Sequence, residues 1–204
     1  MDLSSFTPAS ALITVIVLAL ALEARACAAT ELGQAPSPRL AVIDYSLPST
    51  EARLWVFDVA TRRLLFREHV AHGQGTGENL ARHFSNHDGS HQSSLGLFRT
   101  GETYFGHNGY SLRMEGLEPG TNDGAMARAI VMHGAAYVDP AAARERGRLG
   151  RSWGCPALRP EVAAAVIDSL KDGQMIFAYY PDSGWLAKSP FLDCDKRRGL
   201  SAAK

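Results

Sequence analysis

The stretch LWVFDVATRRLLFREHVA, residues 54–71, is the part of the sequence that decides the fold. It contains two runs rich in aliphatic and aromatic residues, Leu54–Val59 and Leu64–Ala71, and such runs favour extended strands. The four residues between them, Ala60–Arg63, have the right length for a hairpin connection. The stretch therefore predicts two neighbouring antiparallel strands, around which the rest of a sheet is expected to form.

Further strand-like runs lie on both sides of this hairpin. They are Leu40–Tyr45, Leu95–Thr103, Tyr110–Met114, Arg128–Met132 and Gln174–Tyr180. Two short helices are also expected, because a proline precedes each of the segments Ala141–Arg146 and Glu161–Lys171, and Gly173 follows the second. About seven or eight strands with two short helices indicate a mainly β domain, either a β-sandwich or a partly closed barrel.

Length and composition limit the range of functions. A chain of 204 residues is long enough for one domain with a sizeable core. The 21 basic residues balance the 21 acidic ones, which argues against a nucleic-acid-binding protein, because such proteins carry a basic excess. We therefore expect no nucleic-acid partner.

The first thirty residues differ from the rest of the chain. Apart from Thr14, every residue of Ala11–Leu22 is apolar, and small residues prevail in Ala24–Ala29. This pattern is typical of a secretory signal peptide, which ends in small residues at its cleavage site. We expect an exported protein of the periplasm or cell wall, divided into a signal peptide or N-terminal anchor, a linker, one folded domain and a C-terminal tail: residues 1–29, 30–39, 40–181 and 182–204.

A long polar segment, Gly73–Ser94, separates the hairpin from the next strand. It contains four glycines and three histidines, His83, His87 and His91. Long loops in compact domains are more often functional than not, because rigid strands hold them while they present side chains to solvent. We therefore expect this loop to have a functional role.

Two residues offer the chemistry of a thiol enzyme. His133 ends an apolar run, and Cys155 follows Gly154 in the segment SWGC, residues 152–155. A thiol nucleophile needs a base to take its proton, and an imidazole at a strand end is held rigidly enough for that role. Gly154 leaves room for a substrate carbonyl to approach backbone N–H groups, which would form an oxyanion hole. We therefore expect Cys155 to be the nucleophile and His133 its base.

Each residue also has an ordinary structural explanation. Cys155 alone is compatible with a buried inert thiol, or with a disulfide to Cys194 in an exported protein. His133 alone is compatible with a core histidine bonded to the backbone. A zinc site is less favoured, because no C-x-x-C pair occurs among the three cysteines. We expect neither a metal nor a cofactor.

Together, the two segments resemble the active-site signature of YkuD-type L,D-transpeptidases, and most closely a divergent murein L,D-transpeptidase branch. The matching residues are HGAAYV at 133–138 and GRSWGCPA at 150–157, with weaker matches upstream. The resemblance implies a β-rich fold, a cysteine nucleophile with a histidine base, and no cofactor. It also implies acyl transfer from a peptidoglycan stem peptide, through a thioester, to an amine of a neighbouring stem.

The resemblance also assigns roles to single residues. Cys155 and His133 match the nucleophile and the base, while Ser152 and Gly154 match positions that shape the loop and the oxyanion hole. The residues expected to contact substrate are His72, Gly134, Arg151 and Trp153.

Two positions depart from the commoner signature. Trp153 stands where a histidine is usual, and Ala157 stands where an arginine or asparagine is usual. The acyl acceptor and the partner of the substrate carboxylate are therefore left open, with Arg151 or Arg159 as candidates for the missing cation.

The leading hypothesis is an exported murein L,D-transpeptidase that reacts with carbapenem-type inhibitors. If water accepts the acyl group instead, the same residues make an L,D-carboxypeptidase or endopeptidase. A less favoured alternative is a non-catalytic module that binds the cell wall. Papain-like peptidases are disfavoured because they place the cysteine before the histidine, and sortases because their histidine and cysteine are much farther apart in sequence.

Overall fold

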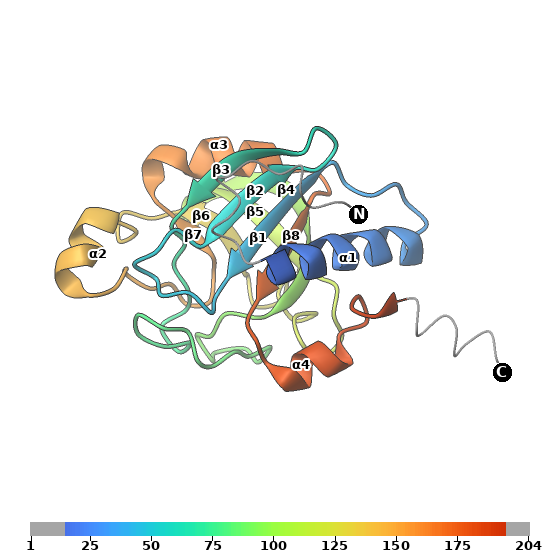
Figure 1. Ribbon diagram of the computed structural model, residues 1–204. Coiled ribbons are helices and arrows are strands. Elements are labelled where there is room, and N and C mark those ends of the chain that lie inside the picture. The colour runs from blue at the N-terminus through green and yellow to red at the C-terminus, as the bar shows by residue number, and fades with distance from the viewer. Residues whose placement is uncertain (1–14, 195–204) are drawn as a thin grey trace.

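The computed structural model describes residues 15–194, in which one eight-stranded sheet forms the centre (Figure 1). The strands are β1 Arg39–Asp44, β2 Leu54–Asp58, β3 Arg63–Glu68, β4 Gly96–Gly106, β5 Gly109–Gly116, β6 Val131–Gly134, β7 Ala157–Leu158 and β8 Met175–Tyr179. They lie in the order β3-β2-β1-β8-β4-β5-β6-β7. The short strand β7 was not predicted, because two residues carry no alternating pattern.

The sheet curls so that its two outer strands, β3 and β7, approach each other. The N–H of Ala71, just after β3, donates to the carbonyl of Ala157 at 2.9 Å, and the N–H of Ser152 donates to the carbonyl of His72 at 3.0 Å. These bonds nearly close the sheet into a barrel. The predicted mainly β fold is therefore confirmed in its partly closed barrel form.

The predicted hairpin is present as β2 and β3, which pair antiparallel. Leu54, Trp55, Val56 and Phe57 on β2 are all fully buried. Burial of successive residues means that both faces of this strand are covered, as in the interior of a sheet with packing on either side. The hairpin thus contributes Trp55, the largest of the fully buried side chains, together with Phe57.

Four helices accompany the sheet in residues 15–194, where the sequence patterns predicted two. They are α1 Val15–Glu31, α2 Pro140–Arg146, α3 Pro160–Leu170 and α4 Ser183–Lys188. The two predicted helices, α2 and α3, begin at a proline, and the Asp139 side chain caps α2 by accepting the N–H groups of Ala141 and Ala142. The six residues of α4 are too few for a periodic pattern to predict.

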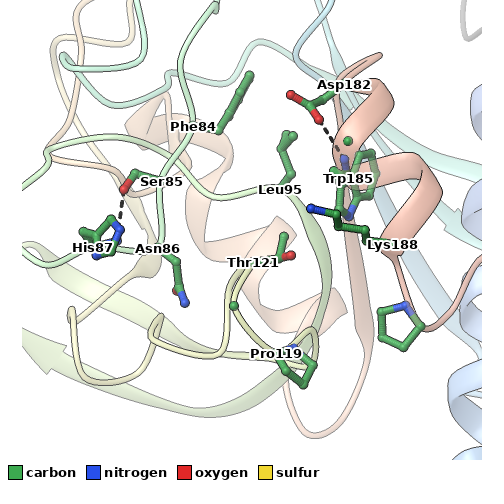
Figure 2. Close-up of a pocket in the computed structure, with 13 residues that line it drawn as sticks. Phe84, Ser85, Asn86, His87, Leu95, Pro119, Thr121, Asp182, Trp185 and Lys188 are labelled. Carbon is green, nitrogen blue, oxygen red and sulfur yellow. Dashed lines mark hydrogen bonds between the residues drawn. The ribbon is translucent and has the colours of Figure 1, made fainter.

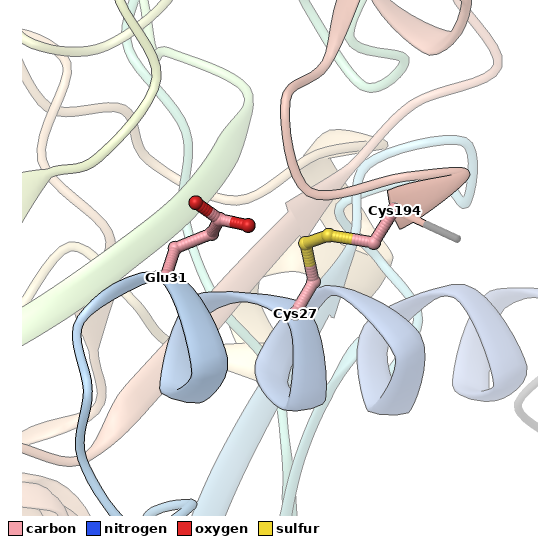
Figure 3. A group of neighbouring side chains, drawn as sticks. All are labelled: Cys27, Glu31 and Cys194. Atoms are coloured by element: carbon pink, nitrogen blue, oxygen red, sulfur yellow. A yellow bond between two sulfur atoms is a disulfide. The ribbon is translucent and has the colours of Figure 1, made fainter. Parts of the chain in front are cut away.

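The helix α1 packs along the sheet beside β1 and β8 (Figure 1). Cys27 on this helix forms a disulfide with Cys194, near the C-terminal end of the described chain (Figure 3). The alternative pairing of Cys194 with Cys155 is therefore wrong, and Cys155 is a free thiol.

The predicted signal peptide overlaps α1. Residues 1–14 lie outside the described part of the chain, while residues 15–29 belong to the helix, whose Leu18, Ala21, Leu22 and Ala28 are buried. Cleavage near residue 29 and the proposed division of the chain stay predictions. No helix within residues 15–194 has the length and apolar character needed to cross a membrane.

The predicted C-terminal tail begins with an ordered element. Trp185 on α4 is buried, and its indole N–H donates to the buried carboxylate of Glu118 at 2.8 Å. The basic cluster Lys196–Arg198 lies outside the described residues. The chain is therefore packed against the domain at least as far as Cys194.

Candidate active site

The strand β6 and the segment leading into β7 bring the two predicted catalytic residues to the same part of the sheet. β6 and β7 pair in parallel, with His133 opposite Ala157, and Cys155 stands two residues before Ala157. The Cys155 sulfur accepts the N–H of Val131 at 3.4 Å, and its thiol donates to the carbonyl of Ala129 at 3.7 Å. The N–H groups of Val131 and His133 point to the same side of β6, because they are two residues apart on a strand. The His133 N–H donates to the carbonyl of Pro156, and the Val131 N–H donates to the Cys155 sulfur where a backbone carbonyl would be usual.

His133 is oriented by its neighbour in the chain. It is 4% exposed, and its Nδ1 lies 3.0 Å from the carbonyl oxygen of Gly134. Because a carbonyl only accepts, Nδ1 carries the proton and Nε2 keeps a lone pair. Burial lowers the pKa of His133, so the ring is neutral at neutral pH. A neutral imidazole with an open lone pair is the form that a general base needs.

The Cys155 thiol is also neutral at rest. Burial raises its pKa, while the N–H of Val131 and the charge of Arg128 offset part of that effect. Within residues 15–194, the hydrogen bonds of the sulfur run to the backbone and not to the His133 ring. The pair is therefore suited to attack assisted by a base rather than to a permanent thiolate–imidazolium pair.

Ser152 fixes the turn that carries Cys155. Its hydroxyl donates to the carbonyl of Cys155 at 2.6 Å and accepts the N–H of Gly154 at 3.0 Å. The Gly154 N–H is thus already used inside the loop. The N–H of Cys155 has no partner among the described residues, and it is the donor that remains open to a substrate oxyanion.

Gly154 is required by its surroundings as well as by its backbone. Its φ of 122° favours glycine, and a Cβ there would lie 2.8 Å from the carbonyl oxygen of Gln92 and 2.9 Å from Ile130 Cδ1. The hydroxyl of Ser93 donates to the Gly154 carbonyl at 3.0 Å. The polar loop 73–94 therefore packs directly on the cysteine turn, which gives this loop a defined place at the site.

His72 is a buried support of that loop. Its Nδ1 lies 2.7 Å from Arg53 Nη2, and its Nε2 lies 3.2 Å from the carbonyl of Gly77. Burial and the Arg53 charge lower the pKa of His72 to about 4, so the ring is neutral. With both ring nitrogens engaged and no exposed surface, His72 connects β3 to the cysteine loop through its own carbonyl, which accepts from Ser152.

The other residues predicted to contact substrate occupy different environments. The Arg151 guanidinium lies 2.8 Å from Glu78, and Arg159 lies 2.8 Å from Glu68, so each of these candidate cations already has a carboxylate partner. A Cβ on Gly134 would lie 3.0 Å from Ala163 on α3, which indicates close packing of strand on helix. Trp153 differs from these, because 71% of its surface is exposed.

Arg128 is the cation whose charge acts on Cys155. It donates from Nη1 to the Ser85 carbonyl at 2.8 Å and the Ser94 hydroxyl at 2.7 Å. From Nη2 it donates to the Ser90 hydroxyl at 3.2 Å and the Gln92 carbonyl at 2.7 Å. No local pattern marks Arg128, because all four partners lie in the distant polar loop.

Tyr137 is a second residue that residue patterns did not single out as functional. Burial, with a smaller contribution from the charge that Cys155 can carry, raises the pKa of Tyr137 to about 12. Its hydroxyl is therefore protonated throughout the neutral range. It adds a neutral polar group to the surroundings of the sulfur.

One cavity of the described chain lies away from the thiol. It has a volume of about 680 Å³ and lies between the loop around Phe84, the turn around Thr121 and α4 with Trp185 and Lys188 (Figure 2). Neither Cys155 nor His133 lines it. A smaller hollow of about 130 Å³, lined by Arg128 and Trp153 among others, is the one that borders the cysteine turn. Cys155 and His133 do not line this hollow either, but Arg128, whose charge acts on the Cys155 sulfur, does.

Within residues 15–194, the loop histidines are not gathered into a cluster of possible metal ligands. His83, His87 and His91 are spaced four residues apart, a spacing that gathers ligands on one face of a helix. Their segment is not helical here, and His91 stacks on Trp153 instead. Within residues 15–194, the one group of neighbouring metal-binding side chains is Cys27, Glu31 and Cys194, and its two sulfurs are joined in the disulfide (Figure 3).

Comparison with known proteins gives a family match. A family model described as L,D-transpeptidase catalytic domain matches residues 10–179, which is most of the chain. No curated protein matches this sequence.

Several solved structures resemble the chain at low identity. An L,D-transpeptidase from Mycobacterium smegmatis is 15% identical over 72% of this chain and 61% of its own, with a TM-score of 0.44. The L,D-transpeptidase LdtMt1 in complex with imipenem is 15% identical over 70% and 59%, with a TM-score of 0.43. The helical cell shape determining protein Pgp2 from Campylobacter jejuni is 12% identical over 72% and 48%, with a TM-score of 0.47. The chain thus spans about half to three fifths of the length of these proteins.

Proposed function

The chain belongs to the L,D-transpeptidase catalytic domain family, and on that premise we propose that it transfers acyl groups between peptidoglycan stem peptides. The observation that carries the proposal is the free thiol of Cys155, held by Val131 and Ala129 beside the strand that bears His133. A half-buried free thiol beside the strand that bears a neutral imidazole provides a nucleophile and a base, which are the minimum equipment for acyl transfer through a thioester.

In the first half-reaction, Cys155 Sγ attacks the carbonyl carbon of a stem-peptide amide. His133 Nε2 takes the thiol proton and delivers it to the amide nitrogen as the C–N bond breaks. The Cys155 N–H donates to the oxyanion of the tetrahedral intermediate, a contact that contributes about 3 kcal/mol in known cases. The products are a thioester on Cys155 and a free amine.

In the second half-reaction, an amine of a neighbouring stem attacks the thioester carbonyl. The C–S bond breaks, a new amide forms, and a proton from the attacking nitrogen returns to the sulfur through His133. If water attacks instead, the product is a shortened stem with a free carboxylate. Transfer and hydrolysis therefore share one acyl-enzyme, and the second nucleophile decides between them.

The test is product analysis by mass spectrometry after incubation with purified tetrapeptide muropeptides. Wild-type protein is expected to give cross-linked dimers, Cys155→Ala to give none, and Ser169→Ala on α3 to behave as wild type. Shortened stems without dimers would reassign the protein as a hydrolase. Wild-type protein that yields neither product would overturn the proposal.

A carbapenem provides a second probe of the same thiol. One of the similar solved structures is a complex of an L,D-transpeptidase with imipenem. We expect imipenem to add its mass to the wild-type protein, because opening of its ring by Cys155 Sγ leaves a stable thioester. The Cys155→Ala protein is expected to stay unmodified. An adduct on both proteins would show that the drug reacts elsewhere.

The proposed substrate requires a location outside the cytoplasm. The disulfide between Cys27 and Cys194 is in keeping with this location, because disulfides persist in oxidising compartments. Cell fractionation followed by N-terminal sequencing tests both export and processing. A cytoplasmic protein would contradict the proposal, whereas the position of the N-terminus decides whether Cys27 remains in the exported chain.

A further inference from the structure

A carboxylate lies beside the disulfide that joins α1 to the C-terminal segment. The sulfurs of Cys27 and Cys194 and a carboxylate oxygen of Glu31 lie within 4.8 Å of one another (Figure 3). Glu31 follows Cys27 by four residues on α1, so one face of the helix carries both side chains. Cys194 is 167 residues away from Cys27 in the sequence. The fold therefore gathers two sulfurs and one carboxylate from two separate segments.

The surroundings of these three side chains favour a cation. Glu31 is the last residue of α1, and the C-terminal end of a helix carries a partial negative charge. The Glu23 carboxylate, one helical turn before Cys27, accepts the backbone N–H of the residue that precedes Cys194 at 2.8 Å. The carbonyl oxygen of Pro190 lies 3.6 Å from Cys27 Sγ and 3.9 Å from Cys194 Sγ. A positive ion beside the sulfurs would therefore face negative groups on several sides.

The two sulfurs are close enough to share a metal ion once the bond between them is broken. Zinc binds cysteine sulfur at about 2.3 Å in tetrahedral geometry, which places two sulfur ligands roughly 3.8 Å apart. The Cα atoms of Cys27 and Cys194 are 6.0 Å apart, so side-chain rotation provides this spacing without movement of the backbone. Both cysteines are buried, whereas Glu31 is exposed, which gives an ion a path from solvent.

We propose that the reduced protein binds a zinc ion through Cys27, Cys194 and Glu31, with water as the fourth ligand. Thiolates and carboxylates are ligands that zinc takes in proteins, and three protein ligands leave one position for water. The bound ion replaces the disulfide as the link between α1 and the C-terminal segment. The inference does not depend on the proposed acyl transfer, because Cys155 is not one of the ligands.

The exchange of one link for the other balances with a phosphine as the reductant. The phosphine gives two electrons to the disulfide and takes oxygen from water, so the S–S bond breaks, two thiols form, and the phosphine becomes its oxide. Zinc then displaces both thiol protons to solvent as two Zn–S bonds form. Binding is therefore expected to weaken as the pH falls, because protons compete with the metal for the sulfurs.

Binding is tested on the full chain, with and without reduction by tris(2-carboxyethyl)phosphine. Each form is titrated with Zn²⁺ in competition with a chromophoric chelator. We expect the reduced protein to bind one ion per chain at this site and the oxidised protein to bind none there. Co²⁺ serves as a second probe, because thiolate ligands give it charge-transfer absorption that hydroxyl ligands do not. A reduced protein that binds neither ion would overturn the proposal.

Variants locate the ion. The paired change Cys27→Ser and Cys194→Ser is expected to abolish binding, and Cys155→Ala to preserve it. Glu31→Gln is expected to weaken binding at least tenfold, since even loss of an outer-shell partner costs about tenfold. Glu145→Gln, an exposed carboxylate on α2, is the matched control. Binding that survives the paired change and disappears in Cys155→Ala would place the ion at the catalytic thiol and overturn the site.

Stability separates a site in the folded protein from binding to unfolded cysteines. Zn²⁺ is expected to raise the urea midpoint of the reduced protein, because a ligand that binds only the folded chain stabilises it. A lowered midpoint would show that the unfolded chain binds the ion more tightly, which contradicts the proposal. If the paired variant does not fold, Glu31→Gln decides, because it leaves both cysteines in place. Unchanged zinc affinity in that variant would overturn the three-ligand site.

Discussion

Arg53 Nη2 lies 2.7 Å from His72 Nδ1, and both side chains are completely buried. The arginine also donates to the carbonyl of Val70, so a single guanidinium holds the chain between β3 and the polar loop. The carbonyl of His72 accepts the N–H of Ser152, so the Arg53–His72 pair also holds the turn that carries Cys155. A buried cation beside a histidine requires that histidine to be neutral.

This pair predicts that the fold is sensitive to acid. The pKa of His72 is lowered from 6.5 to about 4 in the folded protein. Between about pH 6.5 and pH 4, His72 is therefore protonated in the unfolded chain and neutral in the folded chain. The stabilising effect is complete at pH values above the pKa of His72 in the unfolded chain. It is lost as the pH falls toward the pKa of His72 in the folded chain. The expected loss in the free energy of unfolding is about 3 kcal/mol, and urea unfolding at a series of pH values measures it.

Two variants make the assignment specific to His72. His72→Gln removes the titrating group, so the slope of unfolding free energy against pH is expected to flatten between about pH 6.5 and pH 4. His107→Gln, in the exposed turn between β4 and β5, is expected to keep the wild-type slope. Identical slopes for all three proteins would show that other groups cause the acid sensitivity.

The parts of the fold that could be predicted are those that depend on local patterns. The hairpin of β2 and β3 follows from two apolar runs and a short connection, and α3 follows from its proline and the spacing of Val166, Ile167 and Leu170. By contrast, α1 has an apolar run that is equally typical of a signal peptide. Composition alone does not distinguish a helix packed on a sheet from a segment that is removed.

The residues that support the candidate site could not be predicted from the sequence, for a different reason. Cys155 and His133 are marked by their neighbours in sequence, but Arg128 depends on a loop whose contacting residues are 34 to 43 positions away. Gly154 was expected to be a glycine for the sake of the substrate, whereas the structure shows that Gln92 and Ile130 leave no room for a side chain. Such contacts arise only when the barrel closes.

The electrostatics of Cys155 predict the pH dependence of its reactivity. Burial raises the pKa of this thiol, and Arg128 counteracts part of the rise. The thiolate fraction, and with it the rate of alkylation by iodoacetamide, is therefore expected to increase with pH throughout the neutral and mildly alkaline range. Cys155 is the one free thiol of the three cysteines, so mass spectrometry follows its modification directly.

Substitution of Arg128 tests whether its charge lowers the pKa of the Cys155 thiol. Arg128→Gln removes the charge, so alkylation at about pH 8 is expected to slow roughly threefold. Arg128→Lys keeps the charge without the forked hydrogen bonds and is expected to lie closer to wild type. Arg82→Gln, an exposed arginine of the same loop, serves as the control. Faster alkylation in Arg128→Gln would contradict this expectation. It would mean that the polar loop opens, and that easier access of iodoacetamide to the sulfur outweighs the loss of the positive charge.

Gly154 predicts a steric limit on the cysteine turn. Gly154→Ala places a Cβ 2.8 Å from a backbone carbonyl and 2.9 Å from Ile130, at a φ of 122°. We expect a loss of about 1–3 kcal/mol in unfolding free energy and at least a tenfold loss of imipenem acylation. Gly120→Ala, with a φ of 73° and open space around it, isolates the backbone contribution. Equal losses in the two variants would refute the steric explanation.

The disulfide predicts that α1 is a structural part of the domain. Cys27 and Cys194 are separated by 167 residues, and a cross-link over so long a loop restricts the unfolded chain strongly. We expect the paired change Cys27→Ser and Cys194→Ser to lower the free energy of unfolding by about 2–4 kcal/mol, measured in urea. Wild-type protein in reductant should then match the variant.

The mass of the exported protein decides whether this stabilisation operates in the cell. A chain that keeps Cys27 gains the mass of two hydrogens on reduction, whereas a chain cleaved after Ala29 has lost Cys27 and shows no such change. In the second case, reductant is expected to leave the urea midpoint unchanged, and α1 would contribute nothing to the mature fold. Because α1 buries Leu18 and Leu22 against the domain, we expect the first result, which corresponds to the N-terminal anchor and not to cleavage near residue 29.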